Sequence, residues 1–441
     1  MRSSRFVHII GGGLAGTEAA LQLATRDVGV VLYEMRPNVE TPAHKTSMLA
    51  ELVCSNSLKS DVKPSPQALL KEELRTVGSV LLGIAEQHSV PAGRALAVDR
   101  VQFSSAVTEL VQNHPLITLC REEVKDLSGI SRPLILATGP LTSPLLASSV
   151  EARLGARSLY FYDAISPIID AGSIDFSYLF QADRYGEGSG DYWNIPLDRA
   201  EYGEFVSRLR GAEPVVSKEW EHITYFESCL PVEEMARRGD DVLAFGPFRP
   251  VGLRNDAGKR PYAVIQLRRE NVAGDCYNLV GCQTRLPFHV QRELFRALPG
   301  LEQARFLRYG QLHRNTYLDS PRLLTSTLAL RDDGTIRIVG QLCGTEGYVE
   351  SIGTGLLSGI FCWREIQGNA AMPPPRETML GALCQYVSDA ARPFQPMNAH
   401  YGLLGPPPAS IRGRKARRQW LWERAMGAIQ NWRADFILGA N

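Results

Sequence analysis

Three glycines near the N-terminus have the spacing of a phosphate-binding turn. Gly11, Gly13 and Gly16 follow an apolar run, residues 7–10, and precede a helix-forming stretch, residues 17–25. The first glycine allows a tight turn, the second lets the backbone approach a pyrophosphate, and the third allows close packing of helix on strand. The helix N-terminus adds unpaired N–H groups and the positive end of its dipole. The pattern predicts a dinucleotide site, and the alternative is a tight strand-to-helix turn without a ligand.

A second apolar run, residues 28–33, ends at the acidic residue Glu34. Glu34 lies at about the 20-residue distance at which a carboxylate holds a ribose hydroxyl in dinucleotide sites. Strand, glycine turn, helix, second strand and terminal acid together predict an α/β dinucleotide-binding domain. The residues that we expect around the turn are Ile10, Gly11, Gly12, Gly13, Leu14, Ala15 and Gly16.

Two later segments also have the composition of cofactor loops. A strand over residues 133–137 opens into Thr138-Gly139, which is similar to a turn beside the cofactor in flavoproteins of the glutathione-reductase type. A strand over 336–339 is followed by a glycine loop and a small-residue helix over 349–363. Such a loop can hold phosphate or ribityl oxygens, and the alternative is that Gly355 and its neighbours only allow close helix packing. The loop residues predicted to contact the cofactor are Gly340, Gln341, Glu346, Gly347 and Tyr348.

The composition of the chain is that of a globular protein of two or three domains. It has 441 residues, 44% hydrophobic and 22% charged, with a net charge of +1. This balance gives no overall attraction to nucleic acid, although a local basic face is compatible with it. An N-terminus that enters a strand directly, with no long apolar run, indicates a cytoplasmic protein without a membrane span. The eight cysteines form no CxxC pair, so we predict free thiols and no metal site.

Apolar spacing and aromatic content predict how the chain is organised. Residues 66–87 and 101–112 have helical spacing. Aromatic and turn residues become dense from about 165 to 270, which indicates an inserted α+β domain. The two parts of the dinucleotide-binding domain are therefore predicted to be residues 1–164 and 271–441.

A basic run, residues 412–418, precedes a helix-forming segment that contains Trp420, Trp422 and Trp432. Charge runs are usually solvated faces, but this one is the densest basic patch of the chain and a candidate RNA contact. The sequence leaves both interpretations open.

Several long blocks, spread from Val7 to about Pro408, carry a resemblance to one family. They include IIGGGLAGTEAALQLA, AELVCSNSLKS, SCLPVEEMARRG, RYGQLHRNTYLDSP and GQLCGTEGYVESIGTGLLSG. With these blocks the chain resembles the folate- and FAD-dependent tRNA (uracil-5-)-methyltransferases, the TrmFO family. The glycine turn alone is also similar to the related flavoprotein that modifies the wobble uridine of tRNA.

The resemblance implies a Rossmann-like FAD-binding domain of the glutathione-reductase type with an inserted α+β domain, in a cytoplasmic enzyme. It implies that 5,10-methylenetetrahydrofolate gives one carbon, with NADPH or NADH as reductant, to make 5-methyluridine at T-loop position 54 of tRNA. By matching blocks, Cys54 corresponds to the cysteine near the flavin and Cys229 to the proposed nucleophile toward uracil C6. His313, with Arg314 beside it, lies in the segment placed over the folate and flavin rings.

The proposed chemistry needs an activated thiol. Uracil C5 is a poor nucleophile until a thiolate adds at C6, and such a thiol is partly exposed with its pKa lowered by nearby positive charge. Cys54 lies near Lys45 and Lys59 in the sequence. Tyr348 and Glu346 are the candidates for the base that removes the C5 proton.

A few positions depart from the family pattern, and two alternatives stay open. Arg94, Ile195, Cys282 and Cys343 replace the usual residues, which affects the pocket shape and the choice of RNA but leaves Cys54 and Cys229 in place. One alternative is the same chemistry on a uridine of 23S rRNA. The other is an FAD-containing RNA-binding protein that does not methylate.

Overall fold

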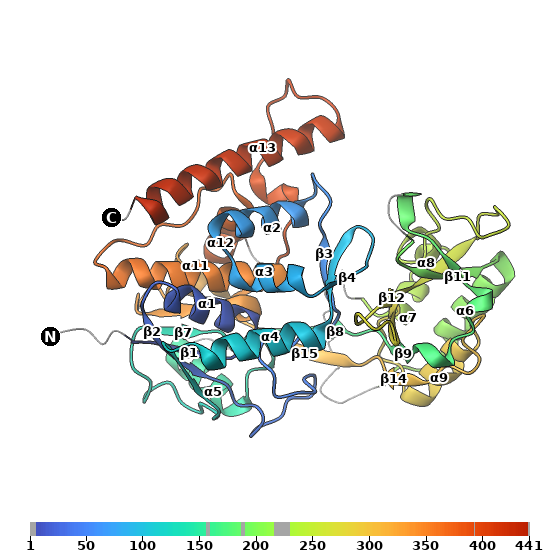
Figure 1. Cartoon of the computed structure of the whole chain (residues 1–441), viewed down its shortest axis with the longest axis horizontal. Helices are drawn as coiled ribbons and strands as arrows, with labels where there is room; N and C mark the ends of the chain where they lie inside the picture. The colour runs from blue at the N-terminus through green and yellow to red at the C-terminus, as the bar shows by residue number, and fades with distance from the viewer. Residues whose placement is uncertain (1–5, 156–158, 187–189, 216–229, 392, 440–441) are drawn as a thin grey trace.

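The protein has two lobes that a two-stranded ribbon connects (Figure 1). The computed structural model describes residues 6–155, 159–186, 190–215, 230–391 and 393–439. The ribbon pairs β8 (Leu159–Ala164) with β15 (Leu312–Tyr317) in antiparallel register. The larger lobe contains both ends of the described chain, and the smaller lobe lies on the right in Figure 1.

The larger lobe is built on a five-stranded parallel sheet in the order β16-β7-β1-β2-β6. In the central strand β1, Val7, Ile9 and Ile10 are buried, as expected for a parallel strand that is covered on both faces. The parallel pairing confirms the predicted α/β class with a Rossmann-like sheet. The strands are β1 (Phe6–Ile10), β2 (Gly29–Tyr33), β6 (Ile117–Cys120), β7 (Leu134–Leu136) and β16 (Ile336–Ile338).

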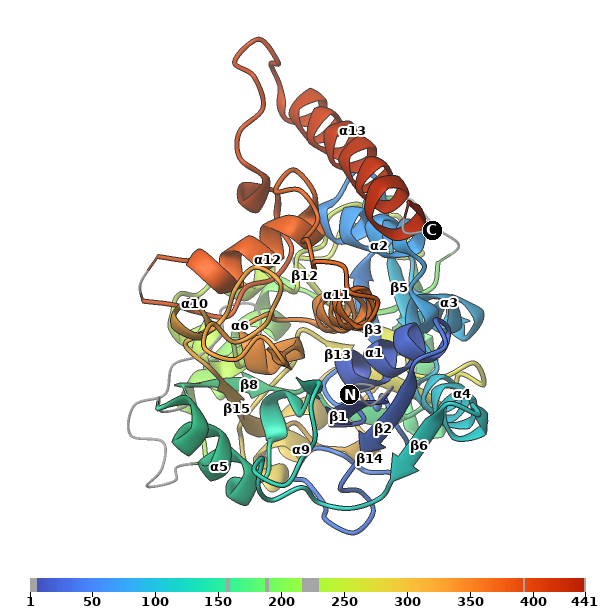
Figure 2. The same ribbon diagram turned by 90° about the vertical axis from the view of Figure 1, so that its left-hand side faces the viewer.

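Two helices that begin beside this sheet pack against each other over a long contact (Figure 2). They are α1 (Leu14–Ala24) and α11 (Tyr348–Ile366). A Cβ atom on Gly355 would lie 2.2 Å from the Ala15 carbonyl oxygen, so a side chain cannot fit at this crossing. Gly355 therefore has the packing role that the sequence left open, while the N-terminus of the same helix stays free to contact a ligand.

The predicted helix over 66–87 is two helices in the structure. Gly78 has φ +95°, which ends α2 (Pro66–Val77), and the Ser79 hydroxyl accepts the Leu82 N–H at the start of α3 (Val80–Gln87). The helix expected over 101–112 is confirmed as α4. The other elements of this lobe are α4 (Arg100–Asn113), α5 (Pro144–Leu154), α10 (Ser320–Leu323), α12 (Met379–Asp389) and the small sheet of β3 (Ser57–Ser60), β5 (Ala95–Val98) and β4 (Ser89–Val90).

The smaller lobe has a six-stranded antiparallel sheet in the order β10-β11-β12-β13-β9-β14 and its own apolar core. The predicted boundary at residue 270 falls inside this lobe, because β13 (Cys276–Val280), α9 (Phe288–Arg296) and β14 (Phe306–Arg308) complete its sheet and core. Its strands are β9 (Ile168–Asp170), β10 (Phe180–Gln181), β11 (Trp193–Leu197), β12 (Ala263–Arg269), β13 (Cys276–Val280) and β14 (Phe306–Arg308). Its helices are α6 (Arg199–Gly211), α7 (Val232–Arg237), α8 (Val242–Phe245) and α9 (Phe288–Arg296).

The C-terminal helix α13 (Arg414–Trp432) lies along α2 on the outside of the larger lobe (Figures 1 and 2). Leu421, Ala425, Ile429 and Trp432 form its buried face, whereas the basic segment at its start is exposed.

Within the described part of the chain, none of the helices combines the length and the apolar character that crossing a membrane requires.

We expect Gly355→Ala to weaken the α1–α11 contact, because the new Cβ meets a backbone oxygen that cannot move freely. Overpacking of this kind lowers the free energy of unfolding by about 1–3 kcal/mol. The measurement is the thermal midpoint of the purified variant together with its retained flavin absorbance. Gly427→Ala in α13 is the control, because its new Cβ has no neighbour within 4 Å. Equal midpoints for wild type and Gly355→Ala would contradict this account.

Candidate active site

The glycine turn forms one wall of a long cavity in the larger lobe. Ile10, Gly11, Gly13, Leu14 and Ala15 line it. Gly11 has φ +108°, and a Cβ on Gly13 would have no neighbour within 4 Å, so a pyrophosphate can approach the backbone there. Gly12 and Gly16 belong to the same turn but do not line the cavity. A Cβ on Gly16 would lie 1.9 Å from the Gly11 carbonyl oxygen, which explains the third glycine.

Glu34 lies at one end of this cavity and is held as a carboxylate. Its Oε2 accepts the Gly12 N–H at 2.9 Å, and its Oε1 accepts the Arg36 N–H and Nε–H at 3.0 and 2.9 Å. Burial opposes ionisation, but the hydrogen bonds and charge of Arg36 lower the pKa of Glu34 below its ordinary value. A fixed, charged carboxylate at this distance from the turn fits a ribose diol. Sequence reasoning missed Arg36, although the Glu-Met-Arg sequence places it two residues away.

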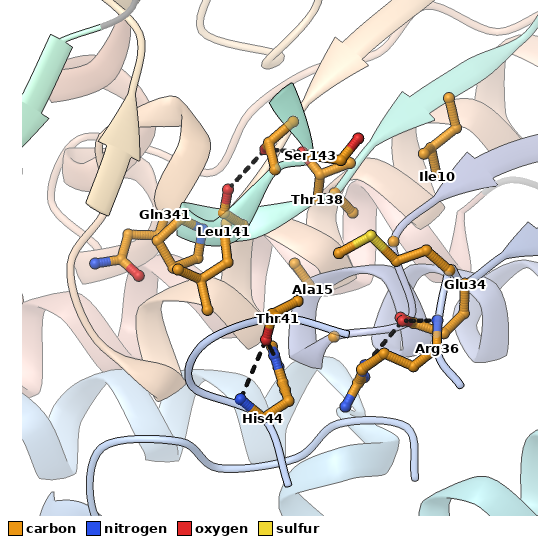
Figure 3. Close-up of a pocket in the computed structure, with 18 of the residues that line it drawn as sticks. Ile10, Ala15, Glu34, Arg36, Thr41, His44, Thr138, Leu141, Ser143 and Gln341 are labelled. Atoms are coloured by element: carbon orange, nitrogen blue, oxygen red, sulfur yellow. Dashed lines mark hydrogen bonds and ion pairs between the residues drawn. The ribbon is translucent and has the colours of Figure 1, made fainter. Parts of the chain in front are cut away.

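The opposite side of the cavity comes from the two later cofactor loops. Figure 3 shows Glu34 and Arg36 on one side, Leu141 and Gln341 on the other, and Thr138 between them. Gly139, Gly340 and Tyr348, which the sequence suggested as cofactor contacts, also line this cavity. A carboxylate for a ribose, an open glycine turn and two helix N-termini along one cavity fit an extended dinucleotide such as FAD.

A second cavity, of about 280 Å³, continues from the first toward the smaller lobe. Leu141, Gln341 and Tyr348 line both cavities, so a ligand in the first has an open face to the second. The structure brings together here four residues from three segments that are far apart in the sequence. They are Cys54, His313, Glu346 and Gly347.

Tyr348 fixes the loop that carries Cys54. Its hydroxyl oxygen accepts the N–H of Cys54 at 2.8 Å and the N–H of Ser55 at 3.1 Å. The loop and the N-terminus of α11 are thus joined where the two cavities meet. Burial raises the pKa of Tyr348 above its ordinary value, so its phenol is neutral and keeps a proton to donate.

The thiol of Cys54 is half-buried, but the direction of its pKa shift differs from that expected for an activated cysteine. Burial, with the negative charge of Asp163, raises its pKa well above the ordinary value, and Arg100 only partly opposes this. Lys59, which the sequence suggested as an activating charge, instead pairs with Glu350 at 3.5 Å. The surroundings of Cys54 therefore favour the neutral thiol.

His313 and Asp163 face each other across the ribbon that joins the lobes. They are paired residues of β15 and β8, and both line the second cavity. Burial and the charge of Arg308 lower the pKa of His313 to about 4, so its imidazole is neutral. Arg314 does not share this cavity, because strand alternation turns it outward, where its guanidinium lies 3.6 Å from the Tyr160 ring centre. Sequence reasoning missed Asp163, which the β8–β15 register identifies.

Glu346 belongs to the loop between β16 and α11 and is 9% exposed. Burial and the negative charge of Asp163 raise its pKa to about 8, and the Gln341 side-chain amide donates to its carboxyl group. Of the two candidate bases, Glu346 is therefore the one that changes protonation near neutral pH.

The smaller lobe is clamped to the Cys54 loop by polar side chains. Asn56 Oδ1 accepts the Arg268 Nε–H at 2.8 Å, and Arg100 pairs with Glu270 at 2.6 Å. Arg268 also lines the second cavity. These residues were not predicted, because no local pattern marks a contact between segments about 200 residues apart.

Cys229 lies outside the described residues. The seven described cysteines are free thiols, and Cys282, Cys343, Cys362 and Cys384 are buried. Among the described residues, no group of three His, Cys, Asp or Glu side chains could hold a metal ion.

Comparison with known proteins identifies the family of the chain. Residues 6–370 match the family model described as glucose inhibited division protein A, GIDA. The solved structure of Aquifex aeolicus GidA covers 97% of this chain and 75% of its own length with a TM-score of 0.68 at 17% identity, so it shows the shared fold.

Two relatives are much more similar in sequence, and both are named methylenetetrahydrofolate--tRNA-(uracil-5-)-methyltransferase TrmFO. The protein from Heliobacterium modesticaldum is 49% identical over 434 residues, which is 98% of this chain and 99% of the relative. The protein from Solibacter usitatus is 50% identical over 445 residues, which is 98% of this chain and all of the relative. Together with the model match, these identities show that the chain belongs to the GIDA family and, within it, to the TrmFO family.

Proposed function

We propose that this protein methylates C5 of the T-loop uridine at position 54 of tRNA. The one-carbon donor is 5,10-methylenetetrahydrofolate, and NADPH or NADH is the reductant. The observation that carries the proposal is the second cavity, where Cys54, His313 and Glu346 meet the open face of a dinucleotide cavity. Membership of the TrmFO family supports the same conclusion, because relatives with 49% and 50% sequence identity over 98% of this chain carry that name.

The first cavity fits FAD. The open backbone at Gly13 suits the pyrophosphate, Glu34 suits a ribose hydroxyl, and Gly139, Gly340 and Gln341 suit the middle of the molecule. When bound and reduced by NADPH or NADH, the flavin would supply the hydride that reduces the transferred carbon to a methyl group. The protein side chains position the uracil and folate and move the protons.

Cys229 is the proposed nucleophile toward uracil C6. Its addition makes C5 nucleophilic, and its departure after the C5 proton is lost restores the double bond. The described chain resumes just after it, and the Val232 N–H donates to the Gln283 carbonyl at 2.7 Å. Gln283 lines the second cavity, so the segment at Val232 lies at this wall. The neutral thiol of Cys54 then serves the flavin side of the cavity rather than the attack on uracil.

Glu346 is the proposed base for the C5 proton. It lines the second cavity, and because its pKa is raised to about 8, its carboxylate becomes the major form only above that pH. Tyr348 is less suited, because its oxygen already accepts two N–H groups and burial keeps it protonated.

The substrate and the nucleophile are tested together in one assay. Purified protein, unmodified tRNA transcript, FAD, NADPH and methylenetetrahydrofolate labelled in its one-carbon unit should give labelled 5-methyluridine in the T-loop. Cys229→Ala should abolish the label and keep the flavin spectrum, whereas Cys120→Ala on β6 should methylate like wild type. A 23S rRNA fragment is tested in parallel. Label in that fragment alone would make rRNA the substrate, and no label with a reducible flavin would leave the non-methylating alternative.

The protonation of Glu346 predicts a pH dependence. Because its pKa is raised to about 8, the base form is scarce below that pH, and the single-turnover methylation rate should rise with pH and level off above about 8. Glu346→Gln should slow this step by about 10²- to 10⁴-fold and remove the rise. Glu377→Gln, at an exposed acidic position, is the control. An unchanged pH profile in Glu346→Gln would exclude this residue as the base.

The exposed basic segment at the start of α13 is a proposed RNA contact. These positive charges lie at the helix N-terminus, where they oppose the helix dipole, and the first turn has no acidic residue to offset them. The charges therefore do not serve helix stability. Replacing Arg412, Arg414 and Lys415 by Gln should weaken tRNA binding and reduce the slope of log K against log salt by up to about 3. The matched control replaces Arg254, Lys259 and Arg260, which are exposed on the smaller lobe. Equal affinity and slope in the two triple variants would argue for a solvated helix face.

A further inference from the structure

A third cavity, of about 340 Å³, opens on the smaller lobe beside the second one. His313 lines both cavities, so its ring stands between them. The start of α9, at Pro287 and Phe288, forms another wall of the third cavity. The third cavity is separate from the first cavity, and none of the roles assigned above uses it.

A column of aromatic rings ends at this cavity. Phe288 is 49% exposed, and its ring stacks on Tyr309 with centres 4.8 Å apart and planes 15° apart. Tyr309 in turn stacks on Phe306 at 5.1 Å and 16°, and Phe306 contacts the core residue Phe295. Phe288 is thus a rigid ring, anchored through two others to the core, with much of its surface open. Single-stranded nucleic acids use such rings as stacking platforms for unpaired bases.

The same wall is suited to a phosphate. The nine-residue helix α9 begins at Phe288, its N-cap residue is Pro287, and no side chain caps its first N–H groups. The first turn contains no acidic residue. Arg285, which also pairs with Glu234, lines the cavity, and Arg292 lies exposed on the same side of α9 as Phe288, one turn further along. A helix N-terminus and two guanidinium groups favour an anion at the edge of the cavity.

A buried polar atom independently indicates a ligand. His313 is 8% exposed, and its Nε2 has no hydrogen-bond partner among the described residues. Buried ring nitrogens of this kind are paired in most proteins, so an orphaned one calls for a group that comes with a ligand. Because the ring is neutral, Nε2 can accept or donate one hydrogen bond to the edge of a base.

We propose that the third cavity holds an unstacked nucleobase that is a sequence neighbour of the target uridine in the RNA loop. The base stacks on Phe288, its edge faces His313, and its phosphate lies at the N-terminus of α9. The target uridine itself occupies the second cavity, where Glu346 lies, so the two bases are splayed on either side of the His313 ring. This inference rests on the RNA substrate proposed above and deepens it by naming where the loop is gripped.

The test uses Phe288→Ala and Phe288→Trp in the full-length protein with bound flavin. A T-arm stem-loop carries 2-aminopurine at either neighbour of the target uridine, because stacking on an aromatic ring quenches its fluorescence. We expect quenching at one of these positions with wild type and the Trp variant, and its loss with the Ala variant. The dissociation constant of the RNA should rise about 5- to 150-fold in Phe288→Ala, in line with the loss of one stacked base.

Control variants show whether a loss of RNA affinity comes from the Phe288 ring. Phe245→Ala removes an aromatic ring that is 79% exposed and lies outside the three cavities, and it should bind RNA like wild type. The KM for methylenetetrahydrofolate and the rate of NADPH oxidation should be the same in all variants. If Phe288→Ala is unstable, Phe288→Leu removes the ring and keeps an apolar side chain.

Two results would overturn the inference. One is wild-type RNA affinity and unchanged fluorescence in Phe288→Ala. The other is a raised KM for the folate with unchanged RNA affinity, which would make the cavity a site for the folate tail. Failure of the proposed function gives a different result, since wild-type protein would then form no 5-methyluridine whatever the fluorescence shows.

Discussion

The close crossing of α1 and α11 is the contact on which the arrangement of the active site depends. The missing side chain of Gly355 lets α11 approach the Ala15 carbonyl, and this sets the distance between two helix N-termini that begin at Leu14 and Tyr348. Both ends line the dinucleotide cavity, one at the glycine turn and one where the two cavities meet. A thicker residue at the crossing would move one end relative to the other. The packing and ligand-binding interpretations of the second glycine segment are thus both needed, because packing along the helix positions its N-terminus.

The second cavity exists because two lobes are held at a fixed separation. The β8–β15 ribbon joins them on one side and brings His313 opposite Asp163. On the other side, Asn56 and Arg268 hold β12 against the Cys54 loop. Hydrogen bonds of this kind to a charged group depend steeply on geometry, so they define the width of the cavity better than apolar packing alone. The residues that shape the cavity are therefore the same ones that connect the lobes.

Local features of the site could be predicted from the sequence, and features that depend on pairing could not. The turn at Gly11 and the carboxylate of Glu34 follow from neighbouring residues, and the structure places both in one cavity. The break at Gly78 was missed because the apolar spacing continues through it. The outward direction of Arg314 needs the strand that begins at Leu312, and Asp163 needs the register between two strands about 150 residues apart. The raised pKa of Cys54 needs its burial, which a list of nearby lysines in the sequence does not give.

A net charge of +1 is compatible with an RNA substrate because positive and neutral groups occupy different parts of the site. Near neutral pH the imidazole of His313 is neutral and Glu346 is mostly protonated, and both lie in the second cavity beside the carboxyl group of Asp163. The lysine and arginine side chains that line this cavity already have protein partners. A neutral pyrimidine loses little hydration free energy on entering such a site, whereas a phosphate would lose much more. Arg285 and the uncapped N-terminus of α9 lie instead beyond His313, on the outer side. This separation admits the base and holds the backbone outside, so local charge rather than the sum over the chain selects the substrate.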